Sequence, residues 1–155
     1  MRRTAVVFKG IDPGSYPTSG GQECPLHASK NYTSTYELLL RMNSVGYRRG
    51  IRLFNERKFY DAHEVWEDVW RECDGLEKKF LQGLIQAAVA FHHYSTGNVA
   101  GAFSLMERSR KNLAACPEEY GGIRVTALLE SLGQWRTALA AGGARPVHPE
   151  IVAME

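Results

Sequence analysis

The sequence predicts an all-α protein: an up-and-down multihelical bundle of about five helices, preceded by an irregular N-terminal arm. From about residue 34 to about residue 141, apolar residues recur at helical spacing. The periodic stretches are separated by glycine, asparagine and aspartate signals that end one helix and begin the next. The connections are short, which favours antiparallel neighbours, and the length of 155 residues suits a single domain.

The two ends of the chain lack this periodicity. Residues 1–33 are rich in Gly, Pro, Ser and Thr and predict an extended arm. Gly142–Gly143 closes the last periodic stretch, and Pro146 and Pro149 follow it. We therefore expect an arm over 1–33, a helical bundle domain over 34–141 and a C-terminal tail over 142–155.

Composition excludes several classes of protein. Nineteen Lys and Arg against seventeen Asp and Glu give a net charge of +2, so neither nucleic acid nor membrane is expected as a partner. The longest apolar stretch, 83–91, is far shorter than the ~20 residues that span a bilayer. The apolar run 5–8 is too brief for a signal peptide, and three scattered cysteines fit reduced thiols. These features predict a cytoplasmic protein.

The first helical stretch extends from about residue 34 to Phe54, and Gly46 and Gly50 weaken its middle. It therefore predicts either one helix or two short ones. Asp61 is followed three positions later by Glu64 and has the form of a capping box. A second helix is accordingly expected over about 62–72.

The 62–72 helix has one apolar face, on which Trp66 and Trp70 fall together. His63 and Glu67 are spaced i and i+4, so they are neighbours on the helix surface. They fall at the edge of the apolar face, beside Trp70.

The next helix, about 76–96, is apolar around most of its circumference, which predicts burial on several sides. Its polar exceptions Gln82, Gln86 and His93 fall on one narrow strip, whereas His92 projects into the apolar arc. Gly97 is placed to end this helix, and Asn98 to cap the next one. Two more helices are expected, over about 99–113 and 123–141.

One set of residues between Tyr47 and about Leu113 forms a specific pattern. The set consists of Gly50, Leu53–Phe54–Asn55, Tyr60, Ala62–His63–Glu64, Glu67, Trp70–Arg71, the run 80–86, Asn98 and Gly101–Ala102. In these residues the chain resembles a known family, the domain of unknown function 309. The resemblance implies an all-helical bundle in which the 62–72 and 76–96 helices form the signature pair, and it implies no reaction.

His63 and Glu67 are the candidate catalytic residues. In the first turn of its predicted helix, His63 would be held neutral by the helix dipole, and a neutral imidazole serves as a general base or a metal ligand. If the two signature helices pack antiparallel, the glutamine strip would face this pair. We therefore expect a polar pocket with His63 and Glu67 as acid–base groups, with Gln82, Gln86 and Trp70 binding substrate. The same pocket could hold a divalent metal on His63, Glu67 and His93.

Two other interpretations remain open, so the sequence leaves undecided whether the protein is an enzyme. His63 and Glu67 could simply bond each other at the edge of the core, with the two glutamines paired between helices. The bundle could instead be a non-catalytic protein-interaction module that binds a peptide, a small molecule or a second copy of itself. This last interpretation predicts a homo-oligomer.

Overall fold

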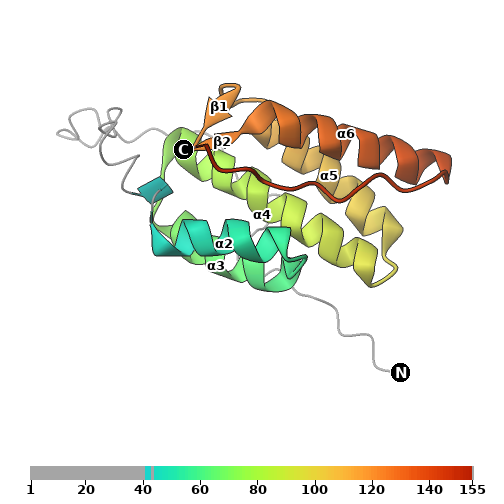
Figure 1. Cartoon of the computed structure of the whole chain (residues 1–155), viewed down its shortest axis with the longest axis horizontal. Helices are drawn as coiled ribbons and strands as arrows, with labels where there is room; N and C mark the ends of the chain where they lie inside the picture. The colour runs from blue at the N-terminus through green and yellow to red at the C-terminus, as the bar shows by residue number, and fades with distance from the viewer. Residues whose placement is uncertain (1–40, 43, 155) are drawn as a thin grey trace, which may run out of the picture. The chain divides into compact units, whose positions relative to one another are not determined.

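The computed structural model describes residues 41, 42 and 44–154, which lie within one compact unit. The predicted all-α bundle is confirmed (Figure 1). The helices of the described part are α2 (Val45–Asn55), α3 (Phe59–Arg71), α4 (Gly75–Ser95), α5 (Val99–Leu113) and α6 (Val125–Ala141). A short hairpin of β1 (Glu119–Tyr120) and β2 (Ile123–Arg124) precedes α6. The arm predicted over 1–33 lies outside the described residues.

Helix α4 is the centre of the bundle. Its contacts extend to α3 on one side and α5 on the other, with α2 packed on α3 and α6 packed on α5 (Figure 1). Side chains from Phe80 to Phe91 are almost all buried, as the apolar circumference of this segment predicts. No helix among the described residues is long and apolar enough to cross a membrane.

Two glycines let neighbouring helices approach closely. A Cβ on Gly50 of α2 would lie 2.1 Å from Nε1 of Trp66 on α3. A Cβ on Gly83 of α4 would lie 2.7 Å from Cγ of Leu113 on α5, and Ser109 donates a hydrogen bond to the Gly83 carbonyl at 2.7 Å. Small residues at these positions therefore set the distance between the helix axes.

The boundaries of α4 and α5 agree with the sequence, whereas the start of α3 does not. Gly97 has a φ of 83°, and the Asn98 side chain accepts a hydrogen bond from the Gly101 amide at 2.9 Å. The predicted capping box of Asp61 and Glu64 is wrong, because α3 begins at Phe59, before either residue. Burial of Phe59 against Phe54 and Phe91 explains the added turn, since tertiary packing outweighs a local capping signal.

The sequence did not predict the hairpin before α6. Gly121 and Gly122 join its strands with φ values of 60° and 70°, which glycine adopts without strain. Tyr47 donates a hydrogen bond to the Gly121 carbonyl at 2.7 Å. This bond ties the beginning of α2 to the hairpin.

The segment after α6 turns back and lies along the bundle. Gly142 has a φ of 66°, and the chain then runs beside α6 until it reaches the hairpin (Figure 1). Ile151 is buried, and Ala153 forms an antiparallel bridge with Ile123. We refer to residues 144–154 as the tail. The tail contains no helix, and the bundle holds it in an extended conformation.

Candidate functional site

His63 and Glu67 lie on α3, and each has a local partner. His63 is buried, and its Nδ1 forms a hydrogen bond with the carbonyl oxygen of Tyr60. The Tyr60 ring contacts the rings of both His63 and His92, with centroid separations of 4.8 and 5.3 Å. Glu67 forms an ion pair with Arg71, one turn later, at 3.8 Å. His63 is the fifth residue of α3, so the predicted effect of the helix dipole on its first turn does not apply.

In the predicted polar strip of α4, Gln86 contacts α5. The Gln86 Oε1 accepts a hydrogen bond from Nδ2 of Asn112 on α5 at 2.8 Å. His93 Nδ1 lies 3.2 Å from Nδ2 of Asn98, which caps α5, and Gln82 is half-buried one turn before Gln86. The structure therefore does not join Gln86 and His93 to His63. A helical wheel could not decide this, because α4 contacts both α3 and α5.

Trp70 is half-buried near the end of α3. The Lys78 ammonium lies 4.3 Å from the centroid of the Trp70 ring, a cation–π contact. The indole Nε1 is buried and has no hydrogen-bond partner among the described residues. Within that part of the chain, no group of three or more His, Cys, Asp or Glu side chains is arranged to hold a metal ion.

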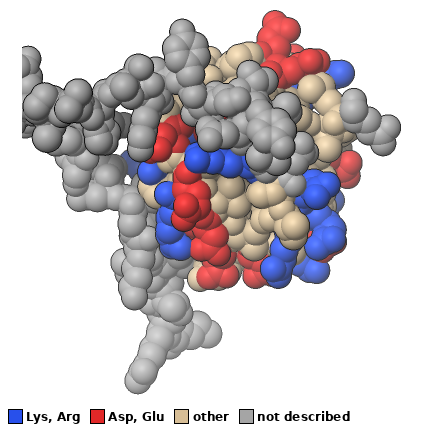
Figure 2. Space-filling view, turned by 90° about the vertical axis from the view of Figure 1, so that its left-hand side faces the viewer, with Lys and Arg blue, Asp and Glu red and all other residues tan. Residues whose placement is uncertain are grey.

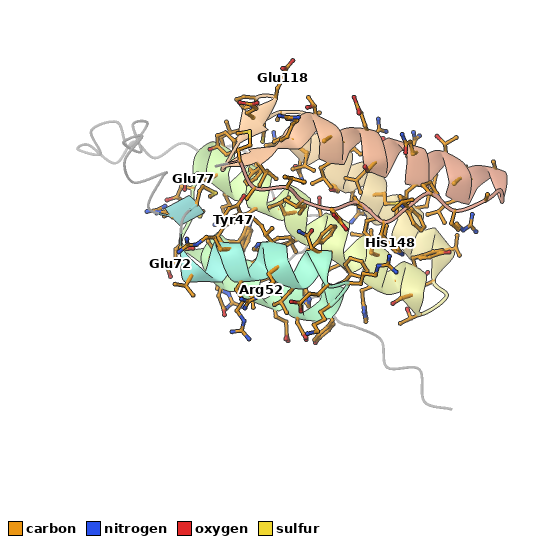
Figure 3. All side chains as sticks on the ribbon, viewed as in Figure 1. Tyr47, Arg52, Glu72, Glu77, Glu118 and His148 are labelled. Atoms are coloured by element: carbon orange, nitrogen blue, oxygen red, sulfur yellow. The ribbon has the colours of Figure 1, made fainter. Side chains whose placement is uncertain are left out.

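A buried carboxylate lies at one end of the bundle (Figure 3). Glu77 is 4% exposed and forms an ion pair with Arg41 at 3.4 Å. Burial, followed by the charge of Glu77, raises the pKa of Cys73 to about 11, so this thiol stays protonated at neutral pH. Figure 2 shows basic and acidic side chains interspersed over this end of the molecule, so the visible face has no continuous surface of one sign.

The surface of the bundle that contacts the tail is the candidate site. Asn55, at the end of α2, forms two hydrogen bonds with the main chain of the tail. Its Nδ2 donates to the Ile151 carbonyl at 2.9 Å, and its Oδ1 accepts from the Ile151 amide at 2.8 Å. A side-chain amide thus satisfies the donor and the acceptor of one residue, as a neighbouring β-strand would. We call this two-way contact the asparagine clasp.

Two further hydrogen bonds reach the main chain of the tail. The Trp135 indole of α6 donates to the Val147 carbonyl at 2.9 Å, and the Met154 amide donates to the Gly122 carbonyl at 2.7 Å. With the asparagine clasp, these bonds are distributed over 147–154. All of them involve main-chain groups of the tail, so they do not depend on the identity of its side chains.

Between these bonds, the His148 ring enters an aromatic cluster on the side of the tail that faces α4 (Figure 3). Its centroid lies 5.7 Å from that of Phe59 on α3, 5.2 Å from Phe91 on α4 and 4.8 Å from Trp135 on α6. The His148 Nδ1 is buried without a hydrogen-bond partner among the described residues. Burial, followed by the charge of Arg57, lowers the pKa of His148 below its ordinary value of 6.5. We call the surface formed by Asn55, Phe59, Phe91 and Trp135 the tail groove.

The end of the tail also covers an apolar cavity. The cavity has a volume of about 170 Å³ and lies against the first turn of α6. This is roughly the volume of a cavity that admits a benzene-sized group. Its lining residues are Arg124, Ala127, Leu128, Glu150, Ile151, Val152 and Met154.

The sequence reasoning missed this site because it assigned the tail no contact with the bundle. Two signals were present. Pro146 and Pro149 favour an extended backbone around His148. Asn55 is a polar residue at a helix end within the run Leu53–Phe54–Asn55, and that run is among the residues of the family resemblance.

The fold and the site define an all-α bundle with its own C-terminal segment packed along it. Residues 47–105 match the model of the family described as Domain of unknown function (DUF309), which confirms the resemblance seen in the sequence. The matched stretch includes Asn55, Phe59 and Phe91, whereas Trp135 and the tail lie beyond it.

Two relatives are similar to part of the chain. An "Uncharacterized protein" of Aquifex aeolicus (strain VF5) is 36% identical over 73 residues, which cover 46% of this chain and 22% of that protein. The "Uncharacterized protein YpuF" of Bacillus subtilis (strain 168) is 38% identical over 60 residues, which cover 38% of this chain and 34% of that protein. The chain thus spans a fifth to a third of the length of these relatives.

Proposed function

We propose that this helical bundle is a protein-interaction module whose tail groove binds an extended peptide segment. The single observation that carries the proposal is the asparagine clasp, in which Asn55 both donates to and accepts from Ile151. Peptide-recognition surfaces combine hydrogen bonds to the main chain with pockets for particular side chains. The tail groove has both features, and the tail is its resident ligand.

The physical basis of this proposal is a division of roles within the groove. The hydrogen bonds of Asn55 and Trp135 are made to backbone groups, so they support any extended segment of suitable length. Affinity for a particular segment comes from the aromatic cluster around position 148, because buried aromatic contacts supply much of the energy of an interface.

A partner has to compete with the tail. A segment tethered by a short connection has an effective concentration on the order of millimolar, so a free peptide binds only weakly while the tail is docked. The connection between α6 and the tail passes through exposed Gly142 and Gly143. Cutting the chain there converts the tail into a dissociable peptide without removing any residue.

We expect the cut tail to remain bound to the bundle. A protease site inserted between Gly142 and Gly143, at an exposed turn that tolerates insertion, is cleaved after folding. Gel filtration at pH 7.5 should then recover the tail fragment together with the bundle. In the Asn55→Ala variant, loss of two hydrogen bonds of about 0.5–1.5 kcal/mol each should weaken retention roughly 5- to 150-fold.

Circular dichroism of the cut Asn55→Ala protein is the control, since its helix content should equal that of the parent. Complete separation of the tail from the cut parent, with the helices intact, would contradict the proposal. Equal retention in parent and variant would show that the asparagine clasp has no role.

A second candidate function is supported by the hydrogen bond of His63. Because the Tyr60 carbonyl can only accept, the His63 Nδ1 carries a proton, and in the neutral ring Nε2 is then the atom with the free lone pair. A carbonyl partner of this kind orients histidines that act as metal ligands or general bases. On this basis His63 remains our candidate base or ligand, with Glu67 as its partner and a divalent metal or a hydrolytic reaction as the proposed chemistry.

Calorimetric titration with Zn²⁺, Mn²⁺ and Ni²⁺ tests this second candidate. We expect binding to the parent that weakens at least about tenfold in His63→Ala and in Glu67→Gln. Thermal unfolding of both variants is the control for folding. Absence of a binding heat in the parent for all three ions would end the metal proposal.

A further inference from the structure

The ring of His148 occupies a place suited to an uncharged ring. The ring is half-buried and packs against Phe59, Phe91 and Trp135, and none of these three groups can accept a proton. Its Nδ1 is buried without a partner among the described residues, so the imidazole gains no hydrogen bond at that atom. A buried polar atom without a partner costs about 1–3 kcal/mol, and an unpaired buried charge costs more.

Packing alone does not account for a histidine at this position. A phenyl ring would make the same aromatic contacts and would leave no buried nitrogen unsatisfied. What imidazole adds is the ability to take up a proton between pH 5 and 8.

We infer that the tail groove selects a segment with an uncharged aromatic or imidazole ring at the place that His148 occupies. Where that ring is an imidazole, as in the tail, its protonation releases the segment. This inference rests on the proposed function, since it specifies the ligand and the regulation of the same groove. The bound state is the docked tail, and the released state is a groove open to another segment.

The groups around His148 agree with release upon protonation. Each of the three packed helices presents an aromatic ring to it: Phe59 from α3, Phe91 from α4 and Trp135 from α6. The connection between α2 and α3 contributes Arg57, whose positive charge acts against the imidazolium form.

Other titratable groups on neighbouring elements either have partners of their own or are exposed. The Tyr94 ring of α4 contacts Trp135, and its hydroxyl accepts a hydrogen bond from Arg145 of the tail at 3.2 Å. Glu107 of α5 forms an ion pair with Arg136, the neighbour of Trp135 on α6, at 2.8 Å. Glu150 is exposed and follows His148 by two positions in the tail.

The direction of the pH effect follows from the lowered pKa of docked His148. The released tail takes up protons more readily than the docked tail, so docking is strongest above the ordinary pKa of 6.5 and weakens as the pH falls below it. Between pH 7.5 and pH 5.0, the docking equilibrium can weaken by up to about 30-fold through this one group.

Hydrogen exchange on the intact full-length chain tests the inference. The Ile151 amide and the Trp135 indole N–H are the reporters, because both form hydrogen bonds that exist only while the tail is docked. After correction for the intrinsic pH dependence of exchange, their protection should fall from pH 7.5 to pH 5.0, by no more than about 30-fold. Amides of the core helix α4 report global unfolding and should keep their protection.

The matched variant is His148→Phe, which keeps the aromatic contacts and removes the titration. Its Ile151 and Trp135 protection should be the same at both pH values and at least equal to that of the parent at pH 7.5. Unchanged protection in the parent, or an equal loss in His148→Phe, would overturn the inference.

The cut chain described above separates this result from the proposed function. Retention of the tail at pH 7.5 together with pH-independent exchange would refute only the role of His148. Loss of the tail at pH 7.5 would refute the groove itself.

Discussion

Replacing Gly50 by alanine is expected to destabilise the bundle by about 3 kcal/mol, the upper end of the usual cost of overpacking. The added Cβ would lie 2.1 Å from Nε1 and 2.4 Å from Cδ1 of Trp66, closer than non-bonded atoms can approach. Trp66 cannot easily move away, because it is fully buried and its indole donates to the Tyr47 carbonyl at 3.2 Å. Urea unfolding followed by circular dichroism measures the loss.

Gly133→Ala is the matched control for this prediction. Gly133 also lies inside a helix, but the nearest side-chain atoms to an added Cβ are those of Arg110, at 3.8 Å. Alanine should therefore be neutral there, or stabilising by up to about 1 kcal/mol through its helix propensity. Equal stability of the two variants would contradict the close approach of α2 to α3 at Gly50.

Trp135→Ala is expected to cost about 3–5 kcal/mol in the free energy of unfolding, as is typical of a buried tryptophan. Trp135 is 1% exposed, and its ring contacts Phe91, Tyr94 and His148. Its loss removes the part of the tail groove contributed by α6. Both global stability, measured by urea unfolding, and the hydrogen-exchange protection of Ile151 should therefore fall.

Trp135→Phe separates these two effects. A phenyl ring keeps most of the packing against Phe91 but cannot donate to the Val147 carbonyl. We expect a smaller loss of global stability, about 1 kcal/mol, together with a looser tail. A tail equally protected in Trp135→Phe and in the parent would mean that the indole hydrogen bond does not hold it.

Most of the helical architecture was predictable because burial in this bundle follows the periodicity of the chain. The 76–96 segment is apolar nearly all round, and α4 is correspondingly the central helix. Asn98 and Gly97 act through local backbone geometry, so their roles were also readable from sequence. The predicted start of α3 was wrong because the helix begins at Phe59, which is buried by rings distant in sequence.

The candidate site was less predictable, because its parts come from opposite ends of the described chain. A helical wheel places Gln86 and His93 on one strip but cannot show that Gln86 bonds to Asn112 of α5. The tail groove depends on the contact of Asn55 with Ile151, 96 positions later. No periodic pattern encodes such a contact, so sequence reasoning found Asn55 only through the family resemblance.

The most direct test of the account is the exchange rate of the Ile151 amide in the unmodified chain at pH 7.5. Asn55 accepts the hydrogen bond of this amide, so its protection measures the asparagine clasp itself. We predict strong protection in the parent and exchange near the free-peptide rate in Asn55→Ala, with α4 equally protected in both proteins. Free-peptide exchange of Ile151 in the parent, while α4 stays protected, would contradict the account.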